Sequence, residues 1–190
     1  MRVAAARGYQ ATTVGDVAAA AEIPVETFDA MFGGKEACFL EAYDAIIDVL
    51  VAHVSSAFES AADARWQDRI VAALRALVDL LATEHDIARM AMVEVTTVGE
   101  EARIRYREAL ERFTPLLEEG RTVSAQGDEL PADTARFAVG GVTSMIFDEV
   151  RAGRGPELRR VLPDLVFAVL MPYIGPEAAE DEMRRVGREG

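Results

Sequence analysis

The sequence predicts an all-α protein with a small N-terminal head of three helices and a larger C-terminal helical body. Ala, Leu and Glu, which all favour helix, recur along its 190 residues. Apolar side chains repeat at spacings of three and four residues over long stretches, and the alternation typical of strands is absent. These patterns together predict about nine helices and no sheet.

The first two helices are expected just after the start of the chain. A short helix covers about Arg2–Arg7 and ends at Gly8, because glycine readily adopts the left-handed conformation that ends helices. Thr13 can cap a second helix, and Asp16 is spaced as its partner in a capping box. One face of that helix then carries four apolar residues, namely Val14, Val17, Ala18 and Ala21.

A tight turn and a third helix follow. Residues 22–24 form the turn, and Pro24 suits the start of a helix because its missing N–H group is not needed there. In the helix 25–32, Phe28 and Phe32 share the inner side, and Gly33-Gly34 ends it. This pattern is typical of a helix-turn-helix, in which the second helix enters the major groove of DNA.

The body is expected to consist of longer helices. A long helix begins at Lys35, and a second runs from about Trp66 to Leu81. Residues 87–95 form a short, nearly all-apolar helix that is expected to be buried all round. Thr97 with Glu100 resembles a second capping box, which would start a helix that extends to about Arg121.

The last part of the chain contains prolines that predict helix starts or bends. Pro115 is expected to bend the helix that contains it. Pro131 opens a helix that reaches about Ala152, and Pro163 marks a kink or a new start within a helical stretch at 158–173. The charged tail after Gly175 is expected to be frayed.

Composition and charge narrow the class of protein. The chain is 51% hydrophobic, carries a formal net charge of −13, and lacks the ~20-residue apolar run that spans a membrane. We therefore expect a cytoplasmic protein without a membrane partner. Its one cysteine, Cys38, excludes an internal disulfide and a thiolate-rich metal site.

At this point the head resembles the TetR (tetracycline-repressor-type) family of transcriptional regulators. The matching residues, at the spacings of that family, are Gly8-Tyr9, Thr12-Thr13-Val14, Asp16-Val17-Ala18, Ala21, Ile23, Thr27-Phe28, Phe32 and Lys35-Glu36. The resemblance implies a homodimeric repressor, with a DNA-binding head at 1–46 and a ligand-sensing and dimerisation domain at 47–190. It further implies that a small hydrophobic ligand in the body spreads the two heads and releases the double-stranded DNA operator.

Several residues depart from the pattern of that family. Glu22 stands where the family has glycine in the turn, so a strained turn is expected. Pro24 replaces a capping serine, Asp29 replaces a tyrosine that reaches a phosphate, and Met31 replaces a histidine. The first helix is also shorter than in the family, and the basic arm that often precedes it is missing from the sequence, so either the chain begins late or that part was never there.

The resemblance places the DNA contacts in the head. Thr13, Thr27 and Lys35 are candidates for phosphate contacts, whereas Val25 and Glu26 would face the bases. Asp29 occupies a contact position but would repel phosphate. Residues 1–46 carry three cationic and seven anionic side chains, a net −4, so we expect weak DNA binding with a shallow salt dependence.

The resemblance also places a ligand cavity and a dimer interface in the body. The candidate ligand-binding residues are Met90, Met92, Tyr106, Leu110, Phe113, Met145 and Phe147, mostly apolar and adaptable. The candidate interface residues lie on the last two long helices, where small side chains allow close approach, and are Gly140, Gly141, Ser144, Leu165 and Val169.

Two other classes of protein are an enzyme and a sensor that does not depend on DNA. The serines lack a nucleophile-elbow context and the chain has no glycine-rich phosphate loop, so we expect no enzyme, no catalytic residue and no cofactor. His53 and His85 are isolated, which predicts no metal site. The acidic head leaves open an alternative function, that of a repressor-derived sensor or protein-binding homodimer with weakened or lost DNA binding.

Overall fold

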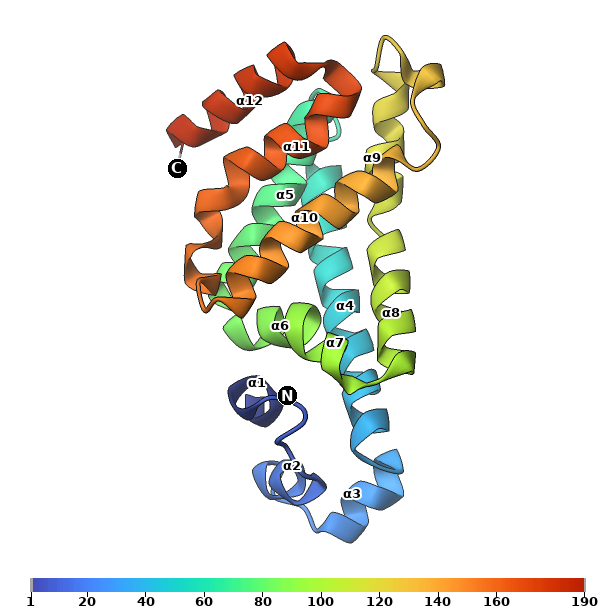
Figure 1. Ribbon diagram of the computed structural model, residues 1–190, viewed down its shortest axis with the longest axis vertical. Helices are drawn as coiled ribbons and strands as arrows, with labels where there is room; N and C mark the ends of the chain where they lie inside the picture. Colours follow the sequence, from blue (N-terminus) through green and yellow to red (C-terminus); the bar gives the residue numbers. More distant parts are fainter. Residues whose placement is uncertain (1, 190) are drawn as a thin grey trace.

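The computed structural model describes residues 2–189, and over these residues the protein is built of helices without a strand. Figure 1 shows a small head at one end and a larger body at the other, joined by one long helix. In chain order the α-helices are α1 (Arg2–Arg7), α2 (Val14–Ala20), α3 (Val25–Phe32), α4 (Lys35–Ser60), α5 (Trp66–Thr83), α6 (His85–Arg89), α7 (Val95–Val98), α8 (Glu100–Glu111), α9 (Thr114–Glu118), α10 (Thr134–Arg151), α11 (Leu162–Ile174) and α12 (Pro176–Glu189).

Four shorter helical turns complete the described chain. A π-helical turn lies between α6 and α7, and three 3-10 turns lie in the second half. They are η1 (Met90–Glu94), η2 (Glu119–Thr122), η3 (Gly127–Glu129) and η4 (Gly155–Val161). None of the described helices is long and apolar enough to cross a membrane.

The head forms as the sequence predicts. Helix α1 ends before Gly8, whose φ of 86° is left-handed. At the start of α2, Thr13 and Asp16 bond each other's backbone N–H groups, so the predicted capping box is present. Pro24 is the N-cap of α3 rather than its first helical residue, and left-handed Gly33 ends that helix.

Helix α4 joins the head to the body without a break. The predicted domain boundary at residue 46 falls inside this helix, so no flexible linker separates the two parts. Its buried face begins in the head with Phe39 and continues through the body to Phe58. Helix α4 is therefore an element that the head and the body share.

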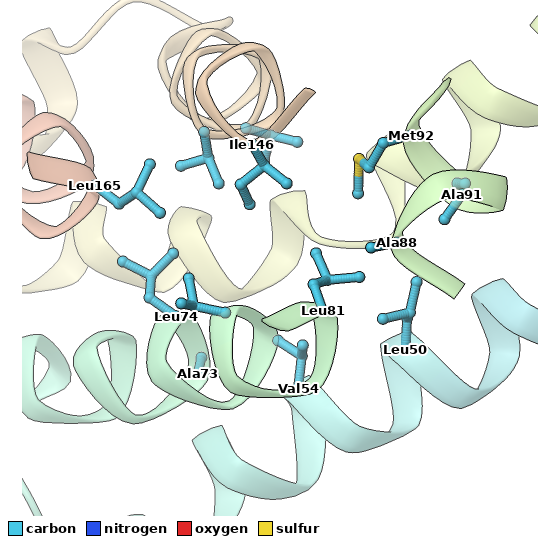
Figure 2. Close-up of a cluster of buried hydrophobic side chains, with 14 of the residues drawn as sticks. Leu50, Val54, Ala73, Leu74, Leu81, Ala88, Ala91, Met92, Ile146 and Leu165 are labelled. Atoms are coloured by element: carbon cyan, nitrogen blue, oxygen red, sulfur yellow. The ribbon is translucent and has the colours of Figure 1, made fainter. Parts of the chain in front are cut away.

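The centre of the body is a core of aliphatic side chains from several helices. Figure 2 shows side chains from α4, α5, α10 and α11 that point toward a common centre, together with Met92 from the π-helical turn. Most of these side chains are almost fully buried, and their loss from water is the main term that stabilises the body.

Two local expectations for the middle of the chain need correction. The stretch predicted as one apolar helix at 87–95 is divided by the π-helical turn, and it contains a buried carboxylate, Glu94. The predicted capping box of Thr97 and Glu100 does not form. The Thr97 hydroxyl instead donates to the carbonyl of Glu94, and Gly99 is the N-cap of α8.

The proline-rich connections agree with the sequence in outline. Helix α8 ends at Glu111, and Pro115 lies in the first turn of α9, so the predicted bend is a break between two helices. Helix α10 begins at Thr134, three residues after Pro131, with the Thr134 hydroxyl bonded to the Pro131 carbonyl. Pro163 lies in the first turn of α11, so it marks a new start.

The tail after Gly175 is not frayed, contrary to the expectation from its charge. It forms α12, which packs on α11 and buries Ala179, Glu182 and Val186. The spacing of these three residues places them on one helix face, which the high charge of the segment conceals. Glu182 pairs with Arg65 at 2.9 Å, which ties the tail to the start of α5.

Candidate DNA interface, head–body junction and ligand cavity

The outer face of α3 carries most of the residues predicted to face DNA. Six of its side chains are exposed, whereas Phe28 is buried and packs against Phe32 with ring centroids 5.0 Å apart. The exposed side chains are Val25, Glu26, Thr27, Asp29, Ala30 and Met31. The head therefore presents this face outward, and Phe28 anchors it to the head's interior.

The candidate phosphate contact at Thr13 is already engaged within the head. Its hydroxyl donates to Asp16 at 2.7 Å and accepts from the Asp16 N–H group at 3.1 Å. The carboxylate of Asp16 also lies 3.1 Å from the Arg7 guanidinium. Hydrogen bonds from Thr13 lower the pKa of Asp16 below its ordinary value, with a smaller effect from Arg7, so this negative charge persists at the start of α2.

The candidate cation Lys35 is likewise used inside the head. Its ammonium group donates to the carbonyls of Tyr9 and Thr12, at 3.0 and 2.9 Å. It also lies 4.1 Å from the centre of the Tyr9 ring, a cation–π arrangement. Lys35 thus ties the start of α4 to the loop between α1 and α2, and a phosphate contact by its ammonium stays a prediction.

The turn between α2 and α3 is strained, as the sequence predicts. Glu22 has a φ of 57°, and no other non-glycine residue among residues 2–189 has a positive φ. The left-handed conformation brings the Cβ atom of an L-residue close to the following carbonyl, at a cost of about 1 kcal/mol. Glu22 also adds an exposed carboxylate next to the recognition helix.

A polar junction between head and body is the main feature that the sequence did not indicate. The N–H group of Tyr9 donates to a carboxylate oxygen of Glu94 at 2.6 Å, and Arg89 donates to the other oxygen at 2.9 Å. Nearby, the Gln10 side chain donates to the carbonyl of Thr97 at 2.5 Å. The only signal in the sequence was the pair of charged residues Arg89 and Glu94 within a mainly apolar stretch.

A row of aromatic rings continues from the junction along α4. Phe39 meets Tyr9 edge to face, with centroids 5.1 Å apart, and lies parallel to Tyr43 at 6.4 Å. Tyr9 belongs to the head, whereas Tyr43 lines a cavity in the body. The row therefore places the cavity and the head loop in contact through a single intervening side chain.

The body encloses an apolar cavity of about 80 Å³. Residues of α4, α5, α8 to α11 and the π-helical turn line it, and only three of them, Tyr43, Tyr106 and Thr143, carry a polar side-chain atom. Four of the predicted ligand-binding residues are in this lining, namely Met92, Tyr106, Leu110 and Phe113. The fold thus brings together residues that lie far apart in the sequence.

The other three predicted ligand-binding residues lie outside that lining. Met90 borders a small void on the head side, beside Tyr9 and Phe39. Met145 and Phe147 are half-buried on α10 and pack against the core, because Ile146 between them takes the inward direction. Sequence periodicity placed these residues on elements that line the cavity but could not give the direction of each side chain.

The predicted dimer residues divide into two groups. Gly140, Gly141 and Ser144 are exposed along one side of α10. Leu165 and Val169, by contrast, are at most 1% exposed and lie inside the subunit, where Val169 lines the cavity. They are therefore not on a surface that a second subunit could reach, because the apolar face of α11 that holds them is turned inward.

Large exposed side chains add to the outward face of α10 and α11. Phe137, one helical turn before Gly140 and Gly141, is 75% exposed, and Met171 of α11 is 40% exposed. An exposed aromatic side chain beside a strip of small residues, as on α10, forms the kind of surface that packs against another helix pair. Sequence periodicity missed Phe137, although an aromatic residue on the glycine-bearing face was a usable signal.

The sequence of the head matches a known protein family, and the fold of nearly the whole chain matches solved structures. Residues 1–42 match the family model described as bacterial regulatory proteins, tetR family. No curated protein sequence matches the chain.

Three solved structures resemble nearly the whole chain. The fatty acid degradation regulator FadR from Bacillus halodurans has a TM-score of 0.75 at 19% identity, covering 90% of this chain and 92% of its own. A bacterial regulatory protein in the tetR family from Rhodococcus RHA1 has a TM-score of 0.67 at 23% identity, covering 92% of both chains. The TetR family transcriptional regulator PfmR from Thermus thermophilus has a TM-score of 0.64 at 18% identity, covering 97% of this chain and 89% of its own.

These matches agree with the geometry. The head is a helix-turn-helix with an outward recognition helix, and the body is helical with an apolar cavity. Residues 1–42 thus carry the sequence pattern of the tetR family model, and the described chain has the fold of these three solved structures.

Proposed function

We propose that this protein is a transcriptional repressor that binds operator DNA as a homodimer and releases it when a small apolar molecule occupies the body. The observation that carries the proposal is the continuity of α4. One unbroken helix begins beside the exposed recognition helix and lines the apolar cavity with Tyr43, Ile47 and Leu50. Any change in the cavity that moves α4 also moves the head.

The size of the cavity supports a switch of this kind. Ligand pockets commonly measure about 300–1,000 Å³, whereas the cavity here measures about 80 Å³. A ligand must therefore push the surrounding helices apart, and the state with expanded walls is favoured only when the ligand is bound. Helix α4 carries that movement to Lys35 and Tyr9, and the bond between Tyr9 and Glu94 carries it from the body side.

Dimerisation through α10 and α11 is the second part of the proposal. The exposed Phe137 and the strip of small residues at Gly140, Gly141 and Ser144 support it. Light scattering of the purified protein is expected to give the mass of two subunits. Gly141→Arg is expected to give one subunit, since a long charged side chain prevents close helix approach, whereas Ala62→Arg on the far loop leaves the dimer intact.

Titration with DNA tests the repressor function directly. The upstream promoter region of the protein's own gene and an unrelated duplex are titrated with the protein at two salt concentrations. We expect binding that prefers the promoter DNA and weakens with salt by a shallow slope, because few cations on the head neutralise phosphates. Nanomolar binding of the unrelated duplex with a steep slope would contradict this expectation.

A sensor with weakened or lost DNA binding is the second candidate, and the acidic head favours it. Asp16, Glu22, Glu26 and Asp29 all lie on or beside the face that DNA would meet, while Lys35 is bonded to backbone carbonyls. If the promoter DNA and the unrelated duplex bind equally weakly while the cavity still takes small molecules, this second function is the better one.

A further inference from the structure

The lining of the cavity in the body contains very few polar atoms. Its residues include no charged side chain, and only three side chains end in a polar atom. The hydroxyl of Thr143 already donates to the carbonyl of Val139 at 2.7 Å, within α10. The polar chemistry available to a bound molecule is therefore that of the phenol groups of Tyr43 and Tyr106.

Tyr43 has a hydroxyl group without a hydrogen-bond partner among the described residues. The residue is only 1% exposed, so water does not satisfy the group from outside. Burial raises the pKa of this phenol well above its ordinary value, so it remains a neutral donor at neutral pH. An unpaired buried donor destabilises a protein, and such groups are uncommon unless they have a function.

The nearest cations lie outside the apolar cavity. Arg105 of α8 and Arg112, the C-cap of that helix, line a charged groove that shares Tyr43 with the cavity. Arg105 pairs with Asp44, and Arg112 pairs with Asp48 at 2.8 Å, so both guanidinium groups are neutralised by carboxylates of α4. A carboxylate inside the cavity would thus be buried without a counter-charge, which is strongly unfavourable.

From these observations we propose that the cavity takes an uncharged, mainly apolar molecule with one oxygen acceptor, such as a ketone or ester, and that Tyr43 donates a hydrogen bond to it. This inference rests on the proposed sensing function and adds the chemical class of the ligand. It excludes free carboxylic acids in their ionised form. In this proposal Tyr43 recognises the ligand. Tyr43 also stacks on Phe39, which belongs to the row of aromatic rings that leads to the head.

The test compares two probes with the same number of carbon atoms, 2-octanone and octanoate, by titration calorimetry of the full chain at pH 7.5. We expect 2-octanone to bind at least about tenfold more tightly than octanoate, because the anion must lose its water without gaining a partner. Tyr43→Phe is expected to weaken 2-octanone binding by about two- to tenfold, the usual worth of one hydrogen bond.

Tyr173→Phe is the matched control. The Tyr173 hydroxyl is also buried without a partner, but the residue packs on Trp66 with ring centroids 5.0 Å apart and does not line the cavity. This variant should bind 2-octanone as the unmodified protein does. Both substitutions remove an unpaired hydroxyl, so both variants should melt at or slightly above the temperature of the unmodified protein, which shows that they fold.

Three results would overturn the inference. Octanoate binding as tightly as 2-octanone, or equal weakening by Tyr43→Phe and Tyr173→Phe, would remove the proposed ligand class while leaving a sensing cavity. Failure of 2-octanone to bind would remove the proposed ligand class, whereas the sensing function is tested separately by the release of promoter DNA. If Tyr43-dependent binding of 2-octanone is found but promoter DNA is not released, the inference stands and the repressor function fails.

Discussion

The outer face of the head and the junction between head and body differ in how their polar groups are satisfied. At the junction, Glu94 and Gln10 each bond to a backbone group across it, at 2.6 and 2.5 Å, and inside the head Lys35 bonds to two carbonyls at 2.9 and 3.0 Å. On the outer face, the carboxylates of Glu26 and Asp29 point into solvent. The position of the head is therefore held by several directional bonds, whereas its charge opposes the approach of a polyanion.

The difference separates two requirements of a DNA-binding switch. Orientation of the recognition helix depends on buried contacts, and these are complete in the head. Affinity for the phosphate backbone depends on exposed cations, and these are scarce. Operator recognition by this head would have to rely on base contacts and on backbone N–H groups at helix starts more than on charge.

The largest effect is expected when the buried side chain on the inner face of α3 is removed. Phe28→Ala should lower the free energy of unfolding by about 3–5 kcal/mol, because a buried ring is replaced by a cavity in a small head core. Met31→Ala, on the same helix but 62% exposed, should change it by less than about 0.5 kcal/mol. Urea unfolding of both variants measures this, and equal losses would show that the outer face does not depend on Phe28.

The next largest effect is expected when the hydrogen bond between Tyr9 and Glu94 at the junction is removed. Glu94→Ala should lower the free energy of unfolding by about 2–3 kcal/mol, because the variant leaves the buried N–H group of Tyr9 without its charged acceptor. Hydrogen exchange at the Tyr9 amide should become faster. Glu100→Ala, which removes an exposed glutamate paired within α8, should change neither quantity appreciably. Unchanged exchange at Tyr9 in Glu94→Ala would mean that this bond does not hold the head.

A smaller effect comes from the strained turn. Glu22→Gly should raise the free energy of unfolding by about 1 kcal/mol, because glycine adopts a φ of 57° without the steric cost. Glu22→Ala removes the same carboxylate but retains the strain, so it should give no such gain. Thermal unfolding of the pair distinguishes strain from charge, and identical shifts for the two variants would show that charge is the cause.

The smallest effect is expected when the charge of the outer face of α3 is reversed. Asp29→Lys places a cation where the outer face now has a carboxylate, so the slope of log affinity against log salt should steepen by about 0.9 per phosphate neutralised. Asp63→Lys makes the same change of charge in the exposed loop after α4, at the opposite end of that helix (Figure 1). Fluorescence anisotropy at several salt concentrations measures both, and an equal slope change would argue against DNA contact by α3.

Much of the head could be predicted because its signals are local. The capping pair Thr13 and Asp16, the glycines at 8 and 33 and the spacing of Phe28 and Phe32 each specify structure within a few residues. The TetR-family resemblance rests on the same segment, and the family match covers residues 1–42. Local patterns of this kind depend on backbone geometry and not on what packs against them.

The features that could not be predicted from the sequence depend on contacts between segments that are distant along the chain. Charge alone suggested a frayed tail, yet α12 is held by a buried face and by the pair of Glu182 with Arg65. Apolar periodicity could not show that Leu165 faces inward while Phe137 faces out, because helices α10 and α11 are apolar on more than one side. The acceptor for the Tyr9 N–H group lies 85 residues away.

The amino-acid sequence by itself determined the all-helical fold, the helix-turn-helix and the acidity of the head, since these follow from composition and from spacings within a few residues. Only the tertiary structure decided that Glu94 holds the head and that the Tyr43 hydroxyl is left unpaired beside the cavity. Burial and hydrogen-bond satisfaction are properties of packed surfaces, so they exist only once the helices are in contact.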